Sequence, residues 1–153
     1  MDSYLPGMII YLDTCSIQRP FDDQSQTRIV LEAEAVLGII DRIETGEVEL
    51  LSSEVLQLET EENPNPMGRR FALDVLALAS RHVVVHDEIE SKAHAYEKAG
   101  LQPYDGLHLA SAVEGEADVF CTTDDALYEI GRTVDTEGTE VLTPVELIEV
   151  IES

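Results

Sequence analysis

Four acidic residues, far apart in the sequence, occupy positions from which their carboxylates could act together. Two of them, Asp13 and Asp124, come just after short apolar runs typical of buried strands. The other two are Glu59, at the end of an expected short helix, and Asp105, in the first turn of another. Two carboxylates ~4 Å apart repel each other by about 4 kcal/mol at an effective dielectric near 20, so a convergent set would have to take up protons or cations. Carboxylate ligands favour hard ions such as Mg²⁺ or Mn²⁺. Such a site suits two-metal phosphodiester hydrolysis, in which one ion activates a water and the other stabilises the leaving oxygen.

Each of these acids also has an ordinary structural explanation. An Asp that follows a strand is a common turn former and helix N-cap, and an acid in a first helical turn is favoured by the helix dipole. Asp105 is the more informative case, because the rest of its helix is apolar. Two assignments have competitors nearby, since Glu54 is an alternative to Glu59 and Asp125 is an alternative to Asp124.

The frame that would position these acids is an alternation of short apolar runs and longer helical patterns. The expected strands are 8–12, 48–51, 82–85, 118–122 and 140–142. The expected helices are 27–45, 53–59, 69–80, 89–99, 103–115 and 145–151. Strands separated by helices predict a parallel sheet with helices on both faces, and ligands of such sheets bind outside the carboxyl ends of the strands. Asp13 and Asp124 would therefore face one crevice if their strands are neighbours.

Length and charge limit the kind of protein this is. With 153 residues, the chain predicts one domain over 1–153. Its net charge of −23 argues against broad, nonspecific nucleic-acid binding, which depends on many Lys and Arg contacts to phosphates. A surface adapted for solubility or salt explains most of the acid excess, because an ion site uses only a few carboxylates. The basic residues that stand out are Arg19, Arg28, Arg69 and Arg70.

Hydropathy and cysteine content predict a cytoplasmic protein. No apolar run approaches the ~20 residues of a membrane span, and the segment 1–10 lacks the charged flank and long apolar stretch of a secretory signal. We therefore expect a cytoplasmic protein without membrane association. Cys15 and Cys121 form no CxxC pair and are expected to be free thiols. The four histidines show no metal-motif spacing, which argues against zinc.

Two other families with an acidic pocket fit less well. A haloacid dehalogenase phosphatase needs a second Asp two residues after the first, where this chain has Cys15. A response-regulator receiver domain needs a Lys at the end of its last strand, whereas the only lysines, Lys92 and Lys98, fall in an expected helix.

The chain resembles the PIN-domain family in four segments. The segment 10–17 resembles the opening strand followed by Asp and Thr, and 53–59 resembles the helix with the second acid. The segment 105–112, Asp-Gly-Leu-His-Leu-Ala-Ser-Ala, resembles the family's Asp-Ala-Leu-His-Leu-Ala-x-Ala, and 119–124 resembles its apolar run followed by Thr-x-Asp. The matches occur in the family's order across most of the chain. Gly106 replaces the usual Ala, and Cys15 the more frequent Asn.

This resemblance implies a three-layer α/β/α fold with a central parallel five-stranded sheet of order 3-2-1-4-5. It implies an Mg²⁺- or Mn²⁺-dependent endoribonuclease that cleaves RNA, in which the metal-binding and catalytic residues are Asp13, Glu59, Asp105 and Asp124. Many small members are VapC-like toxins of toxin–antitoxin pairs, often dimeric, so the resemblance also implies an antitoxin partner and a homodimer. The alternative is a PIN-fold binding or regulatory module with little or no nuclease activity, although such a module would have no reason to retain four mutually repelling carboxylates.

Three further residues are candidates for contact with the substrate. Arg19 follows the first strand and would supply positive charge near the acids. Thr14 and Thr122 would bring hydroxyls to a phosphate or to the acids themselves, and ordinary turn hydrogen bonding explains both equally well.

Overall fold

The sheet is parallel throughout and has the strand order expected from the sequence. The computed structural model describes residues 7–153, so residues 1–6, on which the prediction about a secretory signal partly depends, lie outside the described residues. Five strands pair in the order β3-β2-β1-β4-β5. They are β1 (Ile9–Leu12), β2 (Glu49–Ser53), β3 (Arg81–Val83), β4 (Val119–Cys121) and β5 (Glu140–Leu142). The predicted fold class and strand order are confirmed.

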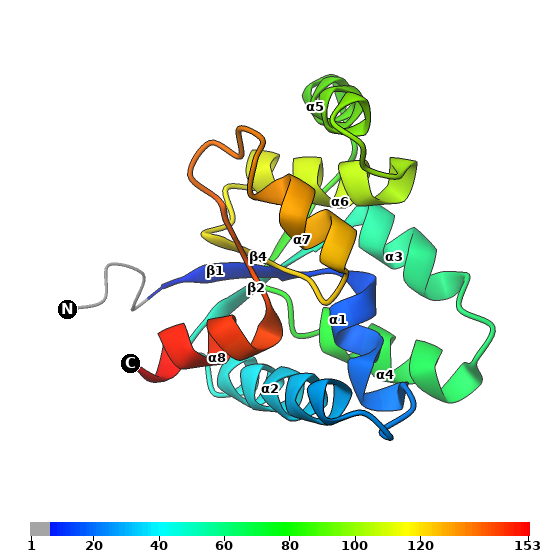
Figure 1. The fold of residues 1–153 in the computed structure, drawn as a ribbon, viewed down its shortest axis with the longest axis vertical. Coiled ribbons are helices and arrows are strands. Elements are labelled where there is room, and N and C mark those ends of the chain that lie inside the picture. The colour runs from blue at the N-terminus through cyan, green and yellow to red at the C-terminus, as the bar shows by residue number, and fades with distance from the viewer. Residues whose placement is uncertain (1–6) are drawn as a thin grey trace.

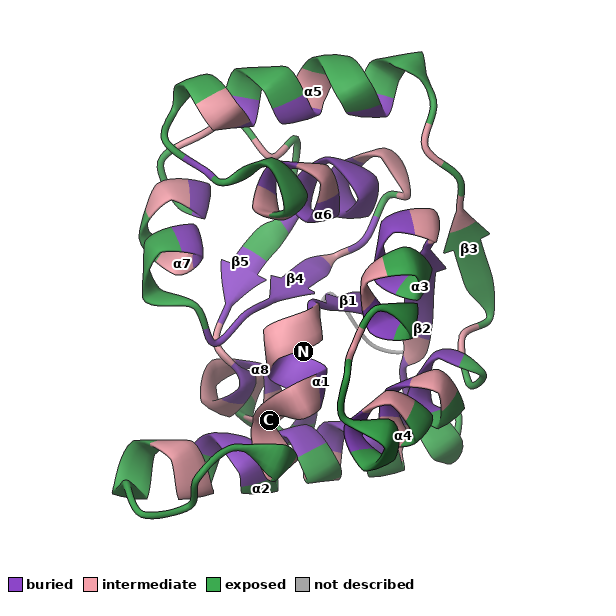
Figure 2. Cartoon of the chain, turned by 90° about the vertical axis from the view of Figure 1, so that its right-hand side faces the viewer, coloured by how far each residue is buried: buried purple, intermediate pink, exposed green. Residues whose placement is uncertain are grey.

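Helices cover both faces of this sheet, which gives three layers (Figure 1). The helices are α1 (Thr14–Gln18), α2 (Thr27–Glu44), α3 (Glu54–Glu61), α4 (Pro66–Leu76), α5 (Asp87–Lys98), α6 (Pro103–Glu114), α7 (Asp125–Gly131) and α8 (Pro144–Glu152), with a 3₁₀ turn η1 (Arg19–Phe21). Helices α6 and α7 lie on one face, with α5 packed outside α6, and α2, α4 and α8 lie on the other (Figures 1 and 2). Figure 2 looks onto the edge of the sheet at which the strands end, and the helix surfaces turned toward the sheet are the buried ones.

The core forms on the central strands. Ile10, Tyr11 and Leu12 of β1 are fully buried, as a strand covered on both faces requires. The Tyr11 ring stacks on Phe120 of β4 with 5.4 Å between ring centroids. Within residues 7–153, no helix combines the length and apolar character needed to cross a membrane. Cys15 and Cys121 are both free thiols, as predicted.

Several boundaries differ from the sequence-based prediction. The prediction missed α1, η1 and α7, because these elements are too short for a helical period to show. Helix α4 begins at Pro66 rather than at 69, since the Asn65 side chain accepts hydrogen bonds from the amides of Met67 and Gly68 and so caps the helix. Strand β3 ends at Val83 instead of Val85.

Gly106, the departure from the family's Ala, has a packing reason. Helix α5 crosses α6 closely at this point, and a Cβ at position 106 would lie 3.0 Å from the carbonyl oxygen of Ala93. The glycine lets the two helices approach, and Asp105 is the residue directly before it.

Candidate active site at the carboxyl edge of the sheet

Asp13 lies at the end of β1 and is almost completely buried. Its backbone amide donates to the carbonyl of Cys121, 3.1 Å away at the end of β4. Its carboxylate caps α1 by accepting a hydrogen bond from the Ser16 amide at 2.9 Å, and both carboxylate oxygens lie 3.1 Å from the Cys15 thiol. Burial raises the pKa of Asp13, and hydrogen bonds from Thr122, Cys15 and Ser16 offset only part of that rise.

Asp124 occupies the equivalent place after the neighbouring strand. Strands β1 and β4 are adjacent and parallel, so both aspartates emerge at the same edge of the sheet, as expected if the strands were neighbours. Asp124 is exposed and caps α7 through a 2.9 Å hydrogen bond from the Leu127 amide. Its competitor Asp125 is ion-paired with Arg28 instead. The N-cap explanation therefore holds for both aspartates, and it is compatible with a shared site, since each cap leads its helix away from the same strand edge.

Asp105, in the first turn of α6, is electrostatically linked to these two aspartates. It is half-buried, and within the described residues its carboxylate accepts no hydrogen bond. Burial raises its pKa to about 6, and the charges of Asp124 and Asp13 contribute next. Three carboxylates from three separate elements thus act on one another.

Glu59, rather than Glu54, faces this group. The Thr14 hydroxyl donates to Oε1 of Glu59, and the same oxygen lies 2.7 Å from Nε2 of His108. Burial tends to raise the pKa of Glu59, but hydrogen bonds to His108 and from Thr14 lower it overall. Glu54 is used elsewhere, because its carboxylate accepts a hydrogen bond from the amide of Val85 beyond β3.

His108 is the site residue that sequence reasoning missed. It is 2% exposed and lies between Tyr11 of β1 and Glu59 of α3. The signal was available in its spacing, since residues three apart on a helix share a face and His108 follows Asp105 by three. Zinc-motif spacing, by contrast, does not single out His108 among the four histidines.

The three proposed substrate contacts have internal partners. Thr14 bonds to Glu59, and Arg19 is ion-paired with Glu32 and Asp22. Thr122 is fully buried, and its hydroxyl accepts a 3.0 Å hydrogen bond from the Asp124 amide. Contact between these side chains and a substrate stays a prediction.

Arg28 lies closer to the acids than the sequence indicated. Its guanidinium donates to the Thr123 carbonyl at 3.0 Å, to Asp125 and to the buried carboxylate of Glu32. It lines a hollow of about 280 Å³ together with Thr122, Thr123 and Asp124. Positive charge is therefore present beside Asp124, although paired acids neutralise it.

The four carboxylates have the atom type and the negative charge that a hard divalent cation requires. The carboxylates supply oxygen ligands. In the part of the chain that the structure describes, the Asp105 carboxylate accepts no hydrogen bond, and burial and the nearby charges disfavour its ionisation. Among residues 7–153, however, no three acidic, His or Cys side chains stand together as a ready-made metal cage. The acids lie close enough for their charges to interact, but within the described residues they are not arranged as the ligands of one ion.

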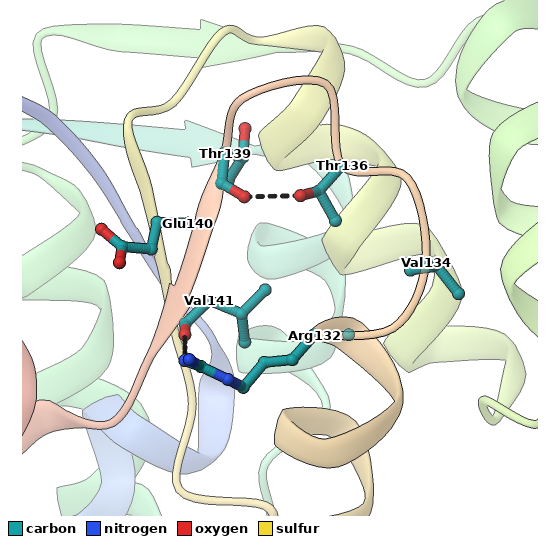
Figure 3. A pocket seen from close by; sticks show the side chains of 7 residues that line it. Arg132, Val134, Thr136, Thr139, Glu140 and Val141 are labelled. Carbon is teal, nitrogen blue, oxygen red and sulfur yellow. Dashed lines mark hydrogen bonds between the residues drawn. The ribbon is translucent and has the colours of Figure 1, made fainter.

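A hollow of about 190 Å³ at strand β5 lies away from these acids (Figure 3). Arg132 donates to the Val141 carbonyl at 2.7 Å and Thr136 to the Thr139 carbonyl at 2.6 Å, so the polar groups there are bonded to each other. Arg132 follows the C-terminal end of α7, whereas Asp124 caps the N-terminal end.

Fold and site together define a class: a parallel α/β protein with acidic side chains gathered where its central strands end. The PIN domain family model matches residues 10–133, and the chain belongs to this family. A comparison with curated protein sequences gave no match.

Three solved structures share the fold at low sequence identity. A chain of VapBC2 from Rickettsia felis, bound to a DNA fragment from its promoter, aligns with a TM-score of 0.54 at 11% identity over 88% of this chain and 98% of that chain. PAE2754 from Pyrobaculum aerophilum aligns with a TM-score of 0.55 at 14% identity over 99% and 96% of the two chains. VapC20 from Mycobacterium tuberculosis, a sarcin–ricin loop cleaving toxin, aligns with a TM-score of 0.52 at 15% identity over 80% and 95%.

Proposed function

We propose that this PIN-domain protein is a divalent-metal-dependent endoribonuclease and the toxin of a toxin–antitoxin pair. The observation that carries the proposal is that the adjacent parallel strands β1 and β4 bring Asp13 and Asp124 to one edge of the sheet, close enough to Asp105 for their charges to raise its pKa. Membership of the PIN family supports nuclease chemistry, and the likeness to VapBC2 and to the RNA-cleaving VapC20 supports RNA as substrate and an antitoxin as partner.

The role that we propose for each side chain follows from its position. Asp13, Asp105, Asp124 and Glu59 would together hold Mg²⁺ or Mn²⁺. Such an ion, when bound, lowers the pKa of a water and stabilises charge on phosphate oxygens. The buried, hydrogen-bonded Asp13 keeps a fixed position, whereas Asp124 is exposed and open to an RNA strand. Arg28 is placed to meet a phosphate if substrate displaces its bond to Asp125.

The remaining expectations belong to the same proposal. We infer that residues 1–153 act as one unit, in the cytoplasm, with an antitoxin and a second copy of the chain as partners. The scarcity of free positive charge near the acids favours a specific RNA over broad RNA binding.

The test is Mn²⁺-dependent cleavage of structured and single-stranded RNA by the wild-type protein and by Asp13→Asn. Asn retains the capping oxygen for α1 but lacks the charge, so we expect cleavage to be lost while the protein stays folded. Asp41→Asn, an exposed aspartate of α2, is the matched control and should cleave normally. Full activity in Asp13→Asn would remove Asp13 from the mechanism. A wild-type protein that neither binds Mn²⁺ nor cleaves RNA would favour the binding module instead.

A further inference from the structure

We infer that His108 is a positioning residue for the nuclease site: with Thr14 it fixes the Glu59 carboxylate by its Oε1 and leaves Oε2 available for ligand. The inference rests on the proposed function for its chemical meaning, but the geometry that carries it is independent of any bound ion. His108 is buried, and its ring nitrogens bond to Tyr11 and to Glu59.

A continuous chain of polar contacts crosses the interior and ends at Glu59. Ser53 Oγ lies 2.8 Å from the Tyr11 hydroxyl, which lies 2.7 Å from Nδ1 of His108. Nε2 of the same ring lies 2.7 Å from Oε1 of Glu59. Ser53, Tyr11 and His108 are all buried, whereas the Glu59 side chain is 28% exposed. The chain thus runs from the core to the one member that opens onto the site.

The hydrogen-bonding capacity of these groups assigns a direction to the chain. Ser53 Oγ already accepts a hydrogen bond from the Leu56 amide, so its own hydrogen is free for the Tyr11 oxygen. Tyr11 can then donate to Nδ1 of His108, and the neutral ring carries its proton on Nε2 and donates to Glu59. This arrangement uses every buried hydroxyl and ring hydrogen. The reverse direction would leave the Ser53 hydrogen buried without an acceptor, which is costly.

Two donors from different elements hold the same oxygen of Glu59. His108 belongs to α6 and Thr14 to α1, and both bond to Oε1. Within the described residues, Oε2 accepts no hydrogen bond. A glutamate near the end of an eight-residue helix would otherwise sample several rotamers. Pinning one oxygen orients the other, and ligand carboxylates that are themselves hydrogen-bonded in this way bind more tightly.

A histidine that only fills space would not need this arrangement. The same volume could be filled by Leu or Phe, yet both ring nitrogens of His108 have partners, on β1 and on α3. The Tyr11 ring meets the His108 ring edge-on, with centroids 5.9 Å apart, which keeps the imidazole plane aimed at Glu59.

The experiment compares His108→Gln, His108→Leu and Tyr11→Phe with the wild-type protein. Gln places an amide nitrogen near the position of Nε2 and retains the donor to Glu59, whereas Leu removes it. Phe at position 11 keeps the ring on Phe120 but removes the hydroxyl that fixes the His108 tautomer. His94→Leu is the control, because His94 is exposed on α5. The readouts are the Mn²⁺ dissociation constant without RNA, kcat and KM for RNA cleavage, thermal unfolding, and the Glu59 conformation in crystal structures.

We expect His108→Leu to weaken Mn²⁺ binding or to lower kcat roughly 10- to 100-fold, with a small change in KM. His108→Gln should recover most of that loss, Tyr11→Phe should fall between the two, and His94→Leu should match the wild type. The inference is wrong if folded His108→Leu binds Mn²⁺ and cleaves RNA normally, or if His108→Gln is as impaired as His108→Leu.

Two further outcomes are decisive. If His108→Leu does not fold, Tyr11→Phe and His108→Gln test the role of His108 in its place. Normal Mn²⁺ binding and normal kcat in Tyr11→Phe would then overturn the inference. If even the wild-type protein neither binds Mn²⁺ nor cleaves RNA, the proposed function fails. The Glu59 conformation still tests positioning in that case, because only His108→Leu or Tyr11→Phe should displace it and an unmoved Glu59 refutes the role.

Discussion

Replacing Asp105 with Asn should make the metal-free protein more stable at neutral pH, which is the opposite of what a substitution at a site normally does. Asp105 carries a negative charge in a half-buried position near the charges of Asp124 and Asp13, and within residues 7–153 its carboxylate accepts no hydrogen bond. Asn keeps the size of the side chain and removes the charge. The gain in stability therefore measures first the cost of burying the Asp105 charge and then the cost of placing it near Asp124 and Asp13.

The magnitude and the sign follow from the pKa of Asp105. This pKa rises from 3.8 to about 6 on folding, and each pH unit corresponds to about 1.4 kcal/mol. Without screening, the Asp105 charge would destabilise the folded state by about 3 kcal/mol. Because the side chain is partly exposed, solvent screening reduces this to roughly 1–2 kcal/mol. Between pH ~4 and ~6 the folded state binds more protons than the unfolded state, so wild-type stability falls as the pH rises through this window. The cost is fully present above about pH 7 and absent below about pH 4.

The assay is urea denaturation of the wild-type protein, Asp105→Asn and the control Asp41→Asn, in EDTA, at pH 4 and pH 8. Asp105→Asn should exceed the wild type in free energy of unfolding at pH 8 and match it at pH 4, while the control should show no such pH-dependent difference. Added Mn²⁺ should reverse the order at pH 8, because an ion that binds only the folded state stabilises the protein with the intact site. Equal stability of wild type and Asp105→Asn at both pH values would refute the claim that the three carboxylates share one field.

Two other predictions concern the ion pairs of Glu32 with Arg19 and Arg28 and the charge of the whole protein. Glu32→Gln should lower the free energy of unfolding by roughly 1–3 kcal/mol in urea denaturation, because this buried carboxylate bonds Arg19 and Arg28 at 2.7 and 3.2 Å; an unchanged value would mean that the pairs contribute nothing. Raising KCl from 0.1 to 1 M should raise the unfolding midpoint by roughly 5 °C, because the Debye length falls from about 10 to about 3 Å and a net charge of −23 repels itself less; a midpoint that falls would contradict this.

Much of the site could be predicted because local chemistry and order along the chain were informative. An acid one to three residues after a buried apolar run, as at Asp13 and Asp124, lies at a strand end wherever that strand is placed. What remained open was which of two acids on one helix points toward the other acids. Glu54 and Glu59 lie on the same short helix, and only the packing of α3 against α1 and α6 separates them, through Thr14 and His108 on one side and Val85 on the other.

The sequence by itself determined the parallel α/β fold, because the alternation of strand and helix patterns is visible locally. Crossover connections between parallel strands are right-handed, which leaves few ways to assemble these elements. It also predicts the kind of ligand, because carboxylates without clustered His or Cys favour hard cations. The resemblance to the PIN family already implied that β1 and β4 are neighbours, and the sheet confirms it. Only the tertiary structure decided that Arg28 bonds the loop carrying Asp124 and that His108 bonds to Glu59. These two contacts join residues 95 and 49 positions apart, and neither periodicity nor composition encodes which distant side chains will meet.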